Sequence, residues 1–281
     1  MSHALTTIKT ILIISLGVLL VLIGIFLIQL IPQRSIASLF KQQPAQQQAK
    51  PEYTLPNVTY ENDTAKDASY QIALIRPKGF PPAIQQKVDA FYDSAKTQTL
   101  LGAQAATTTP QSVTQQPTIY TLASKKPLVT IAGPYVFILA SVASTSAEAQ
   151  GVLNYFEVVY DARTGQEVTL DQFFADQANA YQVIAQAVTP LALDKVALKA
   201  LGDRDPKSLT EQEKQQIISV VQPGLVPVSE NFKYWYLTQD AKLVFVFPPS
   251  QIAPAEFGEQ VVAVPLETIK AYLSPAIFKT Q

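Results

Sequence analysis

Beyond position 41, the chain contains neither histidine nor cysteine: the one histidine of its 281 residues is His3, and cysteine is absent. This composition excludes a Ser-His-Asp or Cys-His catalytic group from that part of the chain, together with any zinc site built from imidazole or thiolate. The ten glycines are scattered without a GxGxxG or GxxxxGK pattern, so no phosphate-binding loop is indicated. We therefore expect no metal and no organic cofactor.

Paired carboxylates are the remaining route to catalysis, because a glycosidase needs two carboxyl groups about 5 to 9.5 Å apart across a cleft. The residues that could supply such a pair are Glu148, Glu157, Asp161, Asp171 and Glu256. The chain has 22 acidic residues, however, and most carboxylates of any domain are solvated, in turns or at helix caps. A carboxylate-only glycan hydrolase is therefore the alternative hypothesis, and the prediction is that the chain is not an enzyme.

The segment 10–33 is uncharged and almost entirely apolar, which is typical of a membrane anchor. At about 1.5 Å per residue, a helix of this length spans the roughly 30 Å hydrocarbon core of a bilayer. We predict a cytoplasmic tail at residues 1–9, a single-pass anchor at 10–33 and an extracytoplasmic domain at the cell membrane. The alternative is a cleaved signal, because Ser35-Ile36-Ala37 resembles a cleavage site; the apolar core is longer than such signals carry.

Charge narrows the choice of partner. All 22 acidic residues and 18 of the 21 basic ones follow Lys41, which gives that part of the chain a net charge of −4. A nucleic-acid-binding domain normally carries a basic stripe, and the densest basic cluster here is the pair Lys125 and Lys126. We expect no nucleic-acid partner, and a mildly acidic surface would favour a basic partner through long-range attraction.

Composition and periodicity divide the rest of the chain. The Gln- and Pro-containing segment 34–68 is typical of a flexible tether, residues 69–274 form one domain, and residues 275–281 form a tail. Within the domain, alternation predicts a strand from Tyr70, and Pro81-Pro82 starts a helix that Gly102 ends. We expect a long exposed loop over 102–117.

The remaining pattern predicts an α+β fold with a mainly antiparallel sheet and packed helices. Further strands are expected at 118–122, 128–132, 135–142, 152–160, 234–238, 243–247 and 260–264. Helices are expected before Pro190, which must bend or end its helix, after the capping box Thr210-Glu213, and over 265–273. The aromatic group Phe232, Tyr234, Trp235 and Tyr236 is predicted to pack in the core.

Several segments resemble one known domain. Tyr155–Phe174, with its turn Asp161-Ala162-Arg163-Thr164-Gly165, resembles the hairpin-and-cap motif of the C-terminal domain shared by RsiV-type anti-sigma factors and PdaC-type peptidoglycan deacetylases. Residues 231–238, 243–248, 251–254, Gly258 and 261–265 resemble the closing pattern of that domain, and 70–90 its strand-helix opening. The chain departs from the family at Ser144–Gly151, where members carry Gly-Gly-Ala-His, and at Ser250, where an aromatic residue is usual.

The resemblance implies a non-catalytic extracytoplasmic domain that is, in RsiV-type members, a receptor for lysozyme. It also implies that the partner-binding surface is the loop from Gln251 to Gly258, with Pro254 between them. The alternative is that this loop is only a rigid turn between two strands. The prediction is thus a membrane-tethered binding domain for a lysozyme-like protein or for peptidoglycan glycan. A structural assembly module of the envelope is the third hypothesis.

Overall fold

The computed structural model describes residues 56–108, 119–146, 149–202, 204–205 and 208–275. The predicted tail at 1–9, the anchor at 10–33, most of the tether and residues 276–281 lie outside these described residues, as does Glu148. Within the described residues, no helix is both long and apolar enough to cross a bilayer. All of these residues belong to one compact unit, Glu52–Gln281.

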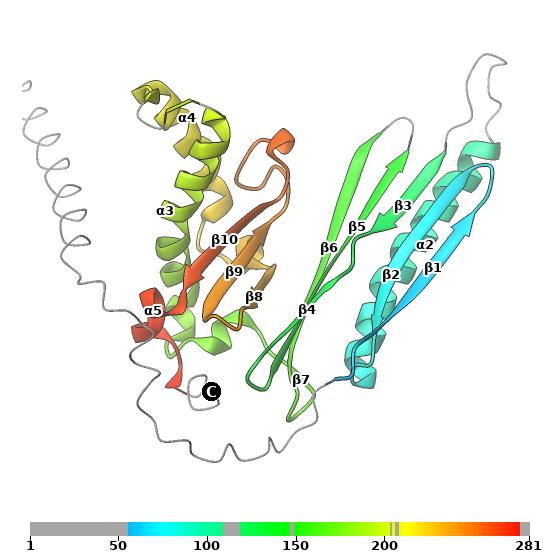
Figure 1. The fold of residues 1–281 in the computed structure, drawn as a ribbon, viewed down its shortest axis with the longest axis horizontal. Coiled ribbons are helices and arrows are strands. Elements are labelled where there is room, and N and C mark those ends of the chain that lie inside the picture. Colours follow the sequence, from blue (N-terminus) through cyan, green and yellow to red (C-terminus); the bar gives the residue numbers. More distant parts are fainter. Residues whose placement is uncertain (1–55, 109–118, 147–148, 203, 206–207, 276–281) are drawn as a thin grey trace, which may run out of the picture. The chain divides into compact units, whose positions relative to one another are not determined.

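A mixed sheet of seven strands forms the first half of this unit (Figure 1). Its strands are β1 (Thr59–Lys66), β2 (Tyr70–Lys78), β3 (Tyr120–Ser124), β4 (Leu128–Ala132), β5 (Tyr135–Ser146), β6 (Ala149–Asp161) and β7 (Gln166–Glu167). The order is β1-β2-β3-β5-β6-β7, with β4 also paired to β5. The β2–β3 pair is parallel and the other pairs are antiparallel. Helix α2 (Pro82–Thr108) connects the two parallel strands, because such a pair needs a crossover.

Helix α2 buries one face of this sheet. Ile84, Val88 and Tyr92 of the helix pack in one core cluster with Ile72 of β2 and Ile138 of β5. The helix continues through Gly102, so the loop predicted from that residue is wrong as far as Thr108. A Cβ atom at position 102 would lie 2.9 Å from the ring of Tyr120. Glycine therefore serves close packing here, not helix termination.

Strand β1 corrects the predicted tether over 34–68. Residues 59–66 pair with β2 along their whole length, from Thr59 opposite Lys78 to Lys66 opposite Gln71. The strand was not predicted because it is polar and mostly exposed, without the apolar alternation that marks a half-buried strand. The folded domain therefore begins about ten residues earlier than the predicted start at 69.

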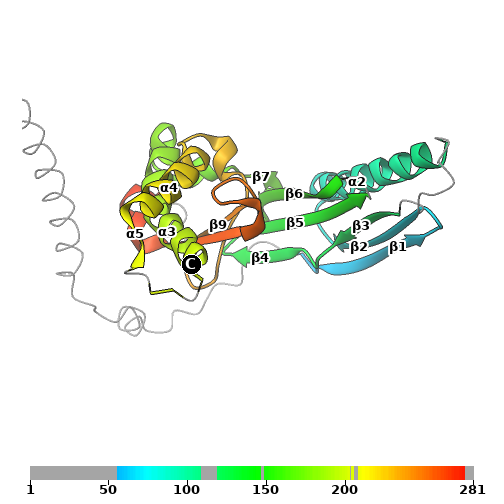
Figure 2. The same ribbon diagram turned by 90° about the horizontal axis from the view of Figure 1, so that it is seen from above.

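The second half contains α3 (Ala180–Leu201), α4 (Glu211–Val221), the short α5 (Leu266–Ile269) and an antiparallel sheet. That sheet has the order β10-β9-β8, with β8 at Trp235–Leu237, β9 at Lys242–Phe247 and β10 at Gln260–Pro265. Figure 2 shows the helices gathered beside these strands. The sheets and helices together confirm the predicted α+β class, with a mixed first sheet.

A second core joins the two halves. Trp235 lies with its ring centroid 5.3 Å from Phe137 of β5 and 5.1 Å from Phe173, in edge-to-face geometry. Phe232 is equally buried, whereas Tyr234 and Tyr236 are half-buried. The predicted core role of this aromatic group is therefore confirmed for Phe232 and Trp235.

Pro190 does not end its helix, because α3 continues from Ala180 to Leu201. Both Pro190 and Gln186, four residues earlier, are exposed, so water can satisfy the carbonyl that loses its helical donor. The neighbouring Thr189 hydroxyl donates to the Ala185 carbonyl at 2.6 Å and satisfies another acceptor of this turn.

The predicted capping box at the start of α4 is confirmed. The Thr210 hydroxyl accepts from the Glu213 amide at 3.2 Å, and the Glu213 carboxylate accepts from the Thr210 amide at 2.8 Å. We expect Thr210→Ala to lower the free energy of unfolding by about 1 kcal/mol, because a helix-terminal amide loses its partner. Urea denaturation measures this loss. The same substitution at Thr97, which is exposed in the interior of α2, is the comparison; an equal loss there would contradict a capping effect.

Candidate functional site

An open groove of about 560 Å³ lies between the face of the first sheet that α2 leaves free and the β8–β10 sheet. In β5, alternation sends Ile138 and Ala140 toward α2 and Leu139 and Ser141 to the other face. The lining side chains come from both sheets: Leu128, Leu139, Ser141, Ala143, Leu153 and Tyr155 from one, and Tyr236, Val246 and Val261 from the other.

The second wall follows the same alternation. Phe245 and Phe247 of β9 and Val262 of β10 enter the second core, whereas Val246 and Val261 line the groove. One face of each sheet therefore packs in a core covered by helices, and part of the other face lines the groove. The result is a mostly apolar slot with polar groups at a few defined positions.

Tyr155 connects the two walls. Its hydroxyl donates to Oε2 of Glu259 at 2.8 Å, and its ring centroid lies 5.1 Å from that of Tyr234. Burial, together with the hydrogen bond to Glu259, raises the pKa of the Tyr155 hydroxyl, so it stays neutral and remains a donor. Among the described residues that line the groove, Glu259 is the one carboxylate.

Two lysines line the groove where β3 leads into β4. Lys125 and Lys126 are both exposed, and Nζ of Lys126 lies 4.4 Å from the ring centroid of Tyr60. Neither forms an ion pair within the part of the chain that the structure describes. They were visible in the sequence as its densest basic cluster, but nothing there placed them beside a groove.

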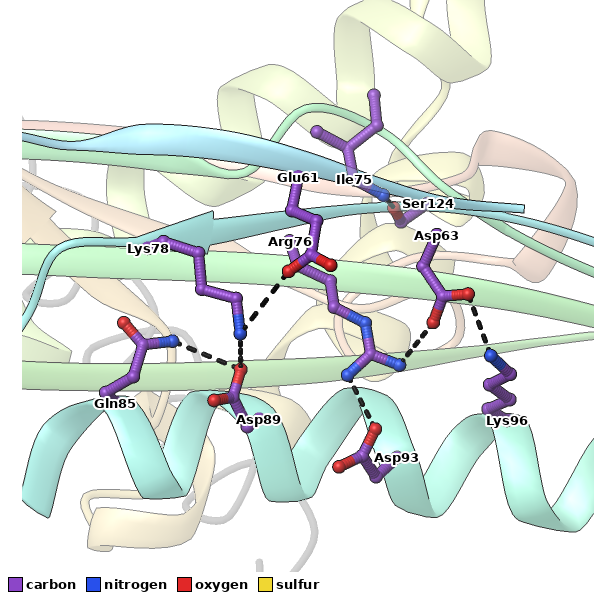
Figure 3. Close-up of polar contacts among 10 residues, drawn as sticks. All are labelled: Glu61, Asp63, Ile75, Arg76, Lys78, Gln85, Asp89, Asp93, Lys96 and Ser124. Atoms are coloured by element: carbon purple, nitrogen blue, oxygen red, sulfur yellow. Dashed lines mark hydrogen bonds and ion pairs between the residues drawn. The ribbon is translucent and has the colours of Figure 1, made fainter. Parts of the chain in front are cut away.

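A second polar cluster lies between the β1–β2 hairpin and α2 (Figure 3). The guanidinium of Arg76, which is 7 % exposed, donates at 2.6 Å to Asp63 of β1 and at 2.6 Å to Asp93 of α2. Lys96 also donates to Asp63 at 2.8 Å, and Lys96 with Arg76 holds the pKa of that carboxyl below its usual range. Its cations and carboxylates pair with one another, so this cluster attaches β1 to the helix and offers no free charge to a ligand.

The predicted site residues do not come together in one place. The Gln251 side chain is structural, since its amide donates to the carbonyls of Gly224 at 3.2 Å and Asn231 at 2.8 Å. Pro254 lines a smaller pocket of about 220 Å³ against α3 and α4. Gly258, at φ +66°, lines the large groove. The three residues of the predicted loop therefore lie in three different environments, and the partner-binding role of the loop stays a prediction.

The candidate carboxylates likewise have separate surroundings. Asp161 holds the turn, accepting from the Arg163 amide at 2.8 Å and pairing with its side chain. Asp171 lies in the first turn of a 3-10 helix that Thr169 precedes, and Glu256 is exposed. Of the described four, none lines the groove. Within the described part of the chain, no cluster of three acidic residues suited to a metal ion occurs.

Glu157 differs from the other carboxylates. It lies on β6, on the face that carries Tyr155 and Val159, and is half-buried. Burial, assisted by the nearby charge of Glu167, raises the pKa of Glu157 from 4.5 to about 8. Its carboxyl is therefore largely protonated at neutral pH, a state set by packing between β6 and the second half of the domain.

These features define an α+β domain of two sheets with an open groove between them. The model of a family described as "Protein of unknown function (DUF3298)" matches residues 171–267, which include α3, α4 and the β8–β10 sheet. The resemblance to RsiV-type and PdaC-type proteins stays a prediction.

Two solved structures of that family are similar to this chain. The crystal structure of a member from Bacteroides fragilis NCTC 9343 superposes with a TM-score of 0.51 at 13% sequence identity, covering 80% of this chain and 98% of that one. A family protein from Pseudomonas aeruginosa PAO1 gives a TM-score of 0.47 at 12% identity, covering 80% and 97%. No curated protein matches. At these identities the likeness to the first structure shows the fold alone.

Proposed function

We propose that this chain is a membrane-tethered, extracytoplasmic, non-catalytic domain that binds the glycan of the cell envelope in the groove between its two sheets. The anchor is the apolar segment 10–33, with the N-terminus in the cytoplasm. The observation that carries the proposal is the groove of about 560 Å³, a size usual for sites that bind small molecules or short polymer segments.

The lining of the groove suits a saccharide. Sugars present apolar C–H faces and polar hydroxyl edges, and they pack their C–H faces on aromatic rings such as those of Tyr155 and Tyr236. Ser141, the Tyr155 hydroxyl and Glu259 supply hydrogen-bonding groups among apolar neighbours. A slot between two sheet faces also fits a chain better than the convex surface of a globular protein, so we favour glycan over a lysozyme-like protein.

Filling the groove should weaken binding. Ala143, exposed on β5, lines the groove, and Ala143→Trp is expected to reduce the affinity for soluble peptidoglycan fragments at least about tenfold by occupying ligand space. Isothermal titration of the full chain in nanodiscs measures the change. Ala178→Trp is the matched control, because Ala178 is exposed in the 3-10 helix Gln177–Asn179 and does not line the groove.

The same preparation tests the other hypotheses. Saturable binding of lysozyme that Ala143→Trp leaves unchanged and Pro254→Ala weakens would favour a protein receptor and contradict the glycan proposal. If neither ligand binds, the result would favour the hypothesis of a structural assembly module of the envelope. We expect no turnover of wall polymers; hydrolysis that Glu157→Gln abolishes would establish the carboxylate hydrolase instead.

A further inference from the structure

We infer that the ligand of the groove is anionic, a saccharide bearing carboxylates, and that one carboxylate lies at Lys125 and Lys126. This inference rests on the proposed function, and it adds the charge and the orientation of the ligand. It starts from the position of two cations beside a largely apolar cavity.

Four described lysines form no ion pair and donate no hydrogen bond to a carbonyl, namely Lys66, Lys125, Lys126 and Lys233, and of these Lys125 and Lys126 line the groove. The lysines with ion pairs are Lys78, Lys87, Lys96, Lys214, Lys242 and Lys270. Lys195 and Lys199 donate to backbone carbonyls of Val261 and Phe257. Lys125 and Lys126 have no such anionic or carbonyl partner among the described residues, and they lie next to each other on a part of the chain whose net charge is −4. They therefore form a local positive site that a carboxylate can occupy.

The opposite side of the groove carries the opposite charge. Glu259 directly precedes β10 and accepts a hydrogen bond from Tyr155 of β6. Strand β5 lies between β3 and β6, so Tyr155 is two strand spacings, about 10 Å, from the strand that leads to the lysines. A carboxylate is attracted to the lysine side and repelled from the Glu259 side.

The second carboxylate oxygen of Glu259 gives the ligand a further contact that fixes its orientation in the groove. Tyr155 occupies Oε2 at 2.8 Å, which leaves Oε1 able to accept from a ligand hydroxyl or amide N–H. Leu139 and Ser141 of β5 lie between the two charged sides and contact the body of the ligand. Glycan strands whose stem peptides have been removed match this pattern, since they carry a carboxylate on every second sugar and acetamido groups on all of them.

The test compares two probes that differ in charge. Glycan strands of alternating N-acetylglucosamine and N-acetylmuramic acid carry carboxylates, and chitin oligosaccharides of the same length do not. With the full chain in nanodiscs, we expect the anionic strands to bind about tenfold more tightly at low salt, since two exposed ion pairs form. The difference should shrink at high salt, because these charges are screened.

The variant Lys125→Gln with Lys126→Gln should abolish this preference while changing the affinity for chitin oligosaccharides less than about twofold. Lys214→Gln with Lys242→Gln is the control of equal net charge, since these residues do not line the groove; it should keep the preference. Equal binding of both probes by the unsubstituted chain would overturn the anionic inference and leave the groove proposal standing. Binding of neither probe would overturn both.

Discussion

Replacing Arg76 with methionine is expected to lower the free energy of unfolding by about 3 kcal/mol, the largest loss among the substitutions considered. Arg76 is 7 % exposed, and its guanidinium forms ion pairs at 2.6 Å with both Asp63 and Asp93. Its loss leaves the half-buried Asp63 paired with Lys96 alone, and removes the ion pair that joins β2 to Asp93 of α2. Asp93 is well exposed, so water takes over its solvation and the loss stays below that of a fully buried pair.

Urea denaturation at neutral pH measures this effect, and two variants sharpen it. Arg76→Lys keeps the charge but cannot donate to two carboxylates in a fixed fork. Its free energy of unfolding should therefore lie between that of the unsubstituted protein and that of Arg76→Met. Lys214→Met removes an exposed pair with Glu211 and should change stability by less than about 0.5 kcal/mol. A loss as small for Arg76→Met as for Lys214→Met would contradict a structural role for the cluster.

Glu157→Gln should make the domain more stable than the unsubstituted protein at alkaline pH. The folded-state pKa of Glu157 is about 8, against an ordinary value of 4.5. A carboxyl whose pKa is raised by folding contributes stability below the lower value and loses that contribution as pH rises toward the higher one. Stability should therefore fall between about pH 5 and pH 8, by about 2 kcal/mol after allowance for partial exposure.

Glutamine is neutral at every pH, so this fall should disappear in Glu157→Gln. The measurement is urea unfolding of both proteins at about pH 5 and about pH 8.5. Glu256→Gln, at an exposed carboxylate, is the control, and its difference from the unsubstituted protein should be similar at both pH values. A Glu157→Gln difference that is also the same at both would show that burial does not hold this carboxyl protonated.

Much of the fold was predictable because its signals are local. Apolar alternation located β5, β6, β9 and β10 to within a few residues, and the Thr210 capping box located the start of α4. The failures arose where tertiary contacts outweigh local preference. Gly102 continues a helix because Tyr120 packs against it, and the polar strand β1 is held by Arg76 and Lys96.

The site was less predictable than the fold. The groove is lined by residues from β3, β4, β5, β6, β8, β9 and β10, which no sequence spacing brings together. Of the three residues predicted from the family loop, only Gly258 lines it. Lys125 and Lys126 stood out by charge, yet their significance depends on the two-sheet packing around them. Glu157 was noticed as a carboxylate, but its environment was not predictable from sequence.

The long β5–β6 pair has a mechanical consequence for the groove. Its alternate residues enter both cores, Ile138 and Val158 on one side and Phe137 and Val159 on the other. One hairpin therefore takes part in both cores, and moving the second sheet away from the first would expose Phe137 and Val159. We expect the groove to be preorganised, so that a ligand enters without closure of the domain and little of its binding energy is lost to ordering the protein.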